Sequence, residues 1–114
     1  MDYDFDLVVI GSGPGGMNAA LQAARASHKV VMIEREYQLG GSCVHHGTIP
    51  SKTLKESAVN LNRCQNITAL LDCQLKDNVQ VESLMTNKER VRDEHVNHMN
   101  ELVEQYNVQC SLQH

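Results

Sequence analysis

The sequence lacks three features that would indicate a membrane, a nucleic acid or the export pathway. No apolar run in its 114 residues approaches the length needed to cross a bilayer. Positive charge is not in excess, since the net charge is −4 and the pI is near 5.8. We therefore expect neither a nucleic acid nor an anionic membrane as a partner. Residues 1–6 are acidic and lead straight into a short apolar run, so we expect no signal peptide.

The cysteines are too far apart to form a C-x-x-C pair. They are Cys43, Cys64, Cys73 and Cys110. Without closely spaced thiols or an export signal, we expect reduced cysteines in a cytoplasmic protein. For the last three we expect small, buried or half-buried side chains without a chemical role. The length and the 41% hydrophobic content suit one small domain, and the sequence has no internal repeat.

Short apolar runs and a glycine turn predict an α/β fold. Residues 6–10 form a β-branched run typical of a buried parallel strand. A glycine turn at 11–16 and a helix at 17–27 lead to a second strand at 29–34, which completes a βαβ unit. The remaining predicted elements are a helix from 51 to about 64, a loop over 65–81, a long helix over 83–105 and a strand that starts at 108. The apolar stripe of the long helix comprises Leu84, Val91, Met99, Leu102 and Tyr106.

The glycine turn matches the G-x-G-x-x-G pattern of a dinucleotide-binding loop. Gly11 permits the tight turn, Gly13 lets the backbone approach a pyrophosphate, and Gly16 lets the helix pack close to the strand. The N-terminus of the following helix offers free N–H groups and a positive dipole end to phosphates. The candidate cofactor-binding residues of this loop are Gly11, Ser12, Gly13, Pro14, Gly15 and Gly16. The alternative is a glycine turn that serves packing only.

An acidic residue stands where a dinucleotide-binding loop requires one. Glu34 closes the second predicted strand, 18 residues beyond Gly16. A carboxylate at this position can accept both hydroxyls of an adenosine ribose. It would repel a 2′-phosphate, so FAD or NAD is favoured over NADP at this site. We group the adjacent Arg35 with the candidate cofactor-binding residues.

The segment Gly40–Lys52 places one thiol beside a second glycine turn. Its sequence is GGSCVHHGTIPSK. Cys43 follows the glycines, and five residues later, where a second thiol would close a small redox ring, the chain has Thr48. One thiol cannot carry a two-electron disulfide cycle within one segment. The segment therefore has the form of a redox-enzyme segment that lacks disulfide chemistry.

Residues 5–54 resemble the flavoprotein disulfide reductases, and the resemblance continues loosely to the end of the chain. In that family the glycine loop binds the FAD pyrophosphate and the carboxylate at the position of Glu34 holds the FAD ribose. A G-G-[ST]-C-x4-C-x-P-S-K segment passes under the isoalloxazine ring, and Thr48 replaces its flavin-proximal thiol. The form C-x-H-x-G-T-I-P-S-K is similar to the soluble pyridine nucleotide transhydrogenases of the same fold group. These lack the cysteine pair and pass a hydride from NADPH to FAD and on to NAD⁺.

The resemblance implies roles for residues of the second segment. Those that would bind FAD are Gly40, Gly41, Ser42, Cys43, Thr48 and Lys52. Thr48 would lie under the ring, and Lys52 near flavin N5 would stabilise negative charge on the reduced ring, so these two are the candidate catalytic residues. The alternatives are a surface lysine for Lys52, a helix N-cap for Ser42 and an inert small side chain for Cys43.

The resemblance also implies that the chain is part of a larger protein. Family members run to several hundred residues, so residues 1–114 would be the N-terminal part of a three-layer, Rossmann-like FAD-binding domain. The nicotinamide and dimerisation domains would be absent, and the parent would be a homodimer. The truncated parallel sheet would have the strand order third–second–first, with residues 7–10 at an open edge that favours self-association. We expect this chain alone to be inactive and to bind FAD weakly or not at all.

Two other functions stay open from the sequence. A disulfide reductase like dihydrolipoamide dehydrogenase would need Cys64 or Cys73 to reach the flavin. A non-catalytic nucleotide-binding module would need the glycine loop but would leave the segment from Cys43 to Lys52 without a use. Transhydrogenation is therefore the preferred interpretation.

Two clusters with histidines do not lead us to expect a metal site. Residues 43–46 include one cysteine and two histidines but lack a fourth ligand at the usual spacing. Residues 94–98 place a glutamate and two histidines on one face of the long helix, and such a face is usually solvated.

Overall fold

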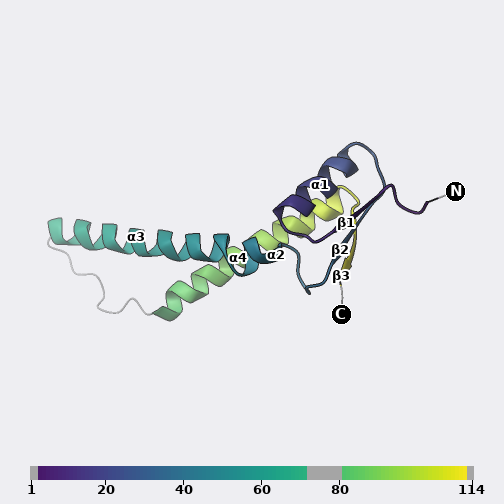
Figure 1. Ribbon diagram of the computed structural model, residues 1–114. Helices are drawn as coiled ribbons and strands as arrows, with labels where there is room; N and C mark the ends of the chain where they lie inside the picture. Colours follow the sequence, from purple (N-terminus) through teal and green to yellow (C-terminus); the bar gives the residue numbers. More distant parts are fainter. Residues whose placement is uncertain (1–2, 72–80, 113–114) are drawn as a thin grey trace.

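The computed structural model describes residues 3–71 and 81–112, and a parallel sheet lies at one end of the molecule (Figure 1). The strands are β1 (Leu7–Ile10), β2 (Val30–Glu34) and β3 (Gln109–Leu112), in the order β1-β2-β3. The register pairs Leu7 with Val30 and Val31 with Gln109. The predicted α/β fold and strand order are confirmed, and β1 lies at an edge of the sheet.

The helices of the described residues connect these strands. They are α1 (Pro14–Arg25), α2 (Gly41–His45), α3 (Thr48–Leu70) and α4 (Val81–Gln105). α1 joins β1 to β2 in the predicted βαβ unit, whereas α3 and the first part of α4 project away from the sheet (Figure 1). The molecule therefore measures 75 × 28 × 18 Å. None of these helices is both long enough and apolar enough to cross a membrane.

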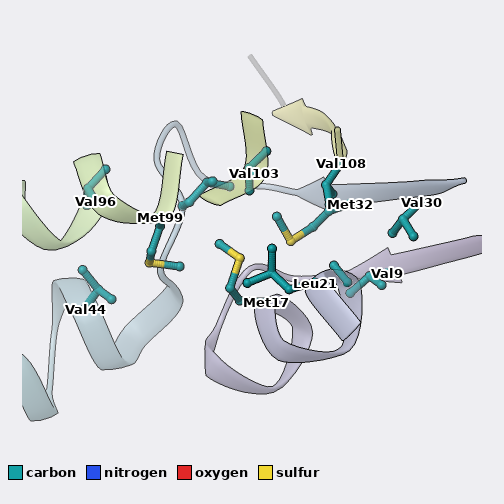
Figure 2. Close-up of a cluster of buried hydrophobic side chains, with 12 residues drawn as sticks. Val9, Met17, Leu21, Val30, Met32, Val44, Val96, Met99, Val103 and Val108 are labelled. Atoms are coloured by element: carbon teal, nitrogen blue, oxygen red, sulfur yellow. The ribbon is translucent and has the colours of Figure 1, made fainter. Parts of the chain in front are cut away.

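One hydrophobic core joins a single face of the sheet to α1, α2 and α4 (Figure 2). Its buried members are Val9, Met17, Ala20, Leu21, Val30, Met32, Leu39, Val44, Val96, Met99, Val103 and Val108. Beyond the core, the guanidinium of Arg25 lies 4.8 Å from the centre of the Tyr106 ring. This cation–π contact joins the end of α1 to the chain just after α4. The core thus fixes α2 and α4 relative to the loop between β1 and α1.

The opposite face of the sheet carries exposed apolar side chains. Val8, Ile10 and Ile33 are 53%, 85% and 40% exposed. Successive side chains of a strand point to opposite faces, and the register places Ile10 beside Ile33. An open apolar face and an open sheet edge therefore adjoin at β1.

We expect the isolated chain to self-associate through β1. The unpaired backbone groups of this edge strand and the exposed side chain of Ile10 provide a template for a second strand. Ile10→Lys should weaken the association because it places a charge on that surface. In sedimentation velocity, the wild type should show a sedimentation coefficient that rises with concentration, and Ile10→Lys should not. Gln22→Lys, on an exposed position of α1, is the charge-matched control. A wild type that stays monomeric would contradict the prediction.

Three helices extend beyond the bounds that the sequence predicts. α4 begins at Val81, the last residue of the predicted loop, rather than at residue 83. α1 begins at Pro14 rather than at residue 17, because proline suits the first turn of a helix. α3 extends from Thr48 to Leu70, so the predicted loop is wrong for residues 65–70. Residues 51–71 contain neither glycine nor proline, so nothing in this stretch interrupts the helix. The prediction for residues 72–80 lies outside the described residues.

The exposure of each cysteine depends on the helix or strand to which it belongs. Cys64 is exposed, contrary to our expectation, because α3 has no buried residue. Cys110 is half-buried, as predicted, and burial raises the pKa of its thiol. Cys73 lies outside the described residues.

The core-facing side of α4 differs in part from the predicted stripe. The structure buries Val96, Met99 and Val103, of which only Met99 belongs to that stripe. The other four predicted residues are half-buried. The helix therefore faces the core along a line slightly rotated from the predicted one.

Candidate functional site

The glycine loop turns sharply between β1 and α1. Gly11 has a φ angle of +94°, a backbone region that side chains disfavour, and its N–H donates to the carbonyl of Ile33 at 2.7 Å. Gly16 lacks space for a side chain, since a Cβ there would lie 1.9 Å from the carbonyl oxygen of Gly11. The tight turn and the close approach of α1 to β1 thus depend on these two glycines.

Gly13 faces open space at the start of α1. It is the N-cap of this 12-residue helix, and a Cβ on it would meet no protein atom within 4 Å. The first N–H groups of an α-helix have no partners within the helix. They also form the positive end of the helix dipole. The space beside Gly13 is therefore suited to an anionic group.

Ser12 is the centre of a buried hydrogen-bond network. Its exposed fraction is 0% and that of Glu34 is 6%. The Ser12 hydroxyl donates to Oε2 of Glu34 at 2.5 Å, and the Ser12 N–H donates to the same oxygen at 2.8 Å. The hydroxyl also accepts from the N–H of Gly40 at 2.9 Å. Ser12 thus joins the glycine loop, the end of β2 and the start of the second glycine turn, a role that the sequence did not indicate.

Hydrogen bonds keep the Glu34 carboxylate ionised despite its burial. Burial raises the pKa of this carboxyl group, while hydrogen bonds from the Ser12 hydroxyl and from neighbouring backbone N–H groups lower it. One of these is the N–H of Glu36, which donates to Oε1 at 3.0 Å. The hydrogen bonds prevail, so the pKa of Glu34 lies below its ordinary value of 4.5. The group at the end of β2 is therefore a carboxylate at neutral pH.

The second glycine turn packs directly against the glycine loop. Gly40 and Gly41 have φ angles of +127° and +60°. A Cβ on Gly41 would lie 3.0 Å from Cα of Gly13. Nε2 of His45 forms a hydrogen bond with the carbonyl oxygen of Leu39 at 2.9 Å, which holds α2 against the turn that precedes it. The two motifs that the sequence assigned to one site are therefore in contact.

A cleft of about 440 Å³ opens between the end of β2, the start of α2 and α4. Its volume falls within the range of small-molecule sites. Its lining residues are Glu34, Arg35, Glu36, Tyr37, Gln38, Gly41, Ser42, His45, His46 and Arg92. Four of these were predicted from the sequence, whereas Arg92 was not. No local motif marks Arg92, because it reaches the cleft from a helix far along the chain.

The two candidate catalytic residues lie on α3, outside this cleft. Thr48 is the first residue of α3 and is exposed. Lys52 follows one turn later and is also exposed. It lines a second hollow, between α3 and α4, together with Val91 and His95 of α4. The roles of Thr48 and Lys52 stay predictions.

Ser42 and Cys43 belong to the short helix α2. The interpretation of Ser42 as a helix N-cap is wrong, because the N-cap of α2 is Gly40 and no side chain caps this helix. Ser42 is exposed and lines the cleft. Cys43 is a half-buried free thiol.

The histidines do not gather with other metal-binding side chains in the part of the chain that the structure describes. Within residues 3–71 and 81–112, no group of three histidine, cysteine, aspartate or glutamate side chains comes together. His98 instead lies 3.8 Å from a carboxylate oxygen of Glu101 on the surface of α4.

The fold places the protein in the Rossmann-like α/β class. A parallel sheet carries a glycine loop at its first strand–helix turn and a buried carboxylate at the end of the next strand. The chain belongs to the pyridine nucleotide-disulphide oxidoreductase family, which matches residues 5–110. This confirms the family expected from the sequence.

Within this family, the chain is similar to proteins named soluble pyridine nucleotide transhydrogenase. The chain is 51% identical over 59 residues to a soluble pyridine nucleotide transhydrogenase from Colwellia psychrerythraea. It is 54% identical over 55 residues to the proteins of that name from Pseudomonas putida and Pseudomonas fluorescens. These matches cover 52% and 48% of this chain, but only 13% and 12% of the relatives. The chain thus spans about an eighth of the length of the relatives it matches.

Proposed function

We propose that this chain is the N-terminal part of an FAD-dependent oxidoreductase that passes a hydride from NADPH through FAD to NAD⁺. The observation that carries the proposal is the hydroxyl of Thr48, in a segment that otherwise has the form of a flavin-binding redox segment. A hydroxyl forms no disulfide and is not a thiolate donor. Without a thiol pair, a second nicotinamide is the simplest acceptor for electrons held on a flavin. The similarity to soluble transhydrogenases supports this interpretation.

The residues present fit an adenine dinucleotide. The open backbone surface at Gly13 and the N–H groups at the start of α1 suit the diphosphate. The Glu34 carboxylate accepts hydrogen bonds from the Ser12 hydroxyl, the Ser12 N–H and the Glu36 N–H. This carboxylate lines the cleft, so a ribose hydroxyl bound there would meet an acceptor. Bound FAD would supply the ring that accepts and returns the hydride.

The residues on α3 would act at that ring. We propose that Lys52 favours negative charge on the reduced ring and that Thr48 lies beneath it. The parent would be a cytoplasmic homodimer with NADPH and NAD as substrates. The homodimer rests on the family resemblance.

The structure disfavours one of the two rival functions and leaves support for the other. For a disulfide reductase, Cys64 lies 16 positions after Thr48 on the same helix. That spacing corresponds to about 24 Å along the helix axis, too far for a thiol beside the same ring. A non-catalytic nucleotide-binding module is the second candidate, favoured by the position of Thr48 and Lys52 outside the cleft.

A chimera tests the proposal directly. Residues 1–54 of this chain would replace the matching segment of the Pseudomonas putida transhydrogenase. We expect the chimera to retain FAD, followed by its visible absorbance through gel filtration, and to reduce a thio-analogue of NAD⁺ with NADPH. Lys52→Ala should lower this rate about a hundredfold, as for loss of one electrostatic stabiliser. Lys29→Ala, an exposed lysine of the grafted segment just before β2, is the matched control.

The outcomes separate the three functions. Reduction of lipoamide or glutathione disulfide without transfer between nicotinamides would indicate a disulfide reductase and contradict the proposal. FAD retention without transfer to either acceptor would indicate a binding module. Loss of FAD from the chimera, with FAD retained by the unmodified relative, would contradict a flavin role for this segment.

A further inference from the structure

We propose that Arg92 of α4 binds a phosphate group of the dinucleotide, an inference that rests on the proposed nucleotide-binding function. Arg92 lines the same cleft as Glu34 and Gly41. Gly41 packs against Gly13, which borders the space suited to an anionic group. The cleft therefore places Arg92 near the Glu34 carboxylate and near Gly41, the residue in contact with the glycine loop.

The packing of α4 explains why Arg92 faces this cleft. Residues four apart on a helix lie on the same face, so Arg92 shares a face with Val96. Val96 belongs to the core beside Val44 of α2 (Figure 2). The contact that holds α4 against α2 therefore also directs Arg92 toward the start of α2, where Gly41 and Ser42 line the cleft.

The guanidinium of Arg92 has hydrogen-bond donors that are not used within the protein. Its Nε and Nη2 donate to Oδ1 of the adjacent Asp93 at 2.9 and 2.7 Å. A guanidinium has five N–H donors, so about three remain for another partner. The side chain of Arg92 is 32% exposed and that of Asp93 is 54% exposed, and exposed ion pairs contribute little stability. The pair with Asp93 therefore leaves Arg92 able to bind a further partner.

Charge within the cleft favours a phosphate as the partner. Glu34 and Glu36 bring negative charge to the lining, so a bound phosphate needs a cation close by. Arg35 is 85% exposed and lies 3.4 Å from Glu36, which reduces its availability. Arg92 is less exposed, and its planar fork matches two phosphate oxygens.

Titration with ADP and with adenosine tests this role. The probe is the full 114-residue chain labelled with ¹⁵N, and chemical shifts give a dissociation constant even for weak binding. We expect Arg92→Gln to raise the dissociation constant for ADP about tenfold, as for loss of a hydrogen bond to a charged group. The dissociation constant for adenosine should stay unchanged. Added salt should weaken ADP binding more in the wild type than in this variant. Arg90→Gln is the matched control, because Arg90 pairs with Glu94 on the exposed surface of α4 and does not line the cleft.

The results distinguish this inference from the function on which it rests. An unchanged ratio of ADP to adenosine affinity in Arg92→Gln, with binding intact, would overturn the role of Arg92 only. Equal weakening of ADP and adenosine would also overturn it, since that pattern indicates contact with the adenosine or a structural effect. ADP needs only the glycine loop, Glu34 and Arg92, which all lie within this chain. A wild-type chain that binds neither compound would therefore overturn the nucleotide site itself, and Arg92 with it.

Discussion

Gly16→Ala should destabilise the chain more than any other single methyl addition in the glycine loop. The new Cβ would lie 1.9 Å from the carbonyl oxygen of Gly11, and no side-chain rotation relieves a clash with backbone. Either α1 must move away from β1 or the turn at Gly11 must open. We expect a loss of about 3 kcal/mol or more in the free energy of unfolding, at the upper end for overpacking. Urea unfolding followed by circular dichroism measures this loss.

Gly15→Ala is the control for this experiment. It adds the same methyl group to the neighbouring position of α1, where a Cβ would meet no atom within 4 Å. Alanine also favours the helix, so the free energy of unfolding should change by about 1 kcal/mol or less, toward greater stability. Equal urea midpoints for the two variants would show that α1 does not need to approach β1 closely.

Ser12→Ala should remove the side-chain hydrogen bonds that join the glycine loop to the end of β2 and to the second glycine turn. It leaves the N–H of Gly40 without its acceptor and removes one hydrogen bond from Oε2 of Glu34. Both losses occur in a buried position, so we expect a destabilisation of about 2 kcal/mol at neutral pH. The affinity for ADP should fall as well, because Gly41 and Glu34 lose the link that fixes their relative position. Urea unfolding and the ADP titration measure the two effects.

The pH dependence of this destabilisation identifies its cause. The folded state lowers the pKa of Glu34 below 4.5, so its contribution to stability is present above that pH. The contribution is lost as the pH falls through the folded-state pKa. The loss in Ser12→Ala should therefore be larger at pH 7 than below the pKa of the wild-type carboxyl group. Ser51→Ala, which removes an exposed hydroxyl bonded to the carbonyl of Thr48, should show a small effect at every pH. A pH-independent loss in Ser12→Ala would contradict the role of the ionised carboxylate.

Features that depend on a local sequence pattern could be predicted from the sequence. The βαβ unit, the glycine loop and Glu34 each depend on a local pattern, namely an apolar run, a glycine spacing or a residue at the end of a strand. Glycine positions constrain the backbone directly, so Gly11 and Gly16 could be placed before the fold was known.

One local feature was predicted wrongly: residues 65–70 form a helix rather than a loop, because no glycine or proline interrupts that stretch. Other features depend on which segments come into contact. The stripe of α4 shifted to include Val96 and Val103, since the position of α2 and the sheet decides which side of that helix is covered. The exposure of Cys64 follows from the same cause, as α3 projects away from the core (Figure 1).

The sequence by itself determined the α/β class, the glycine loop and the thiol-free position at Thr48, because each is set by residue type and local spacing. The strand order was expected from the family resemblance, and the structure confirms it. Only the tertiary structure decided that Ser12 joins three segments, that the two glycine turns touch and that Arg92 reaches the cleft. These are contacts between segments far apart in the chain. They arise because the core packs α2 and α4 against one face of the sheet, and no spacing along the sequence encodes that arrangement.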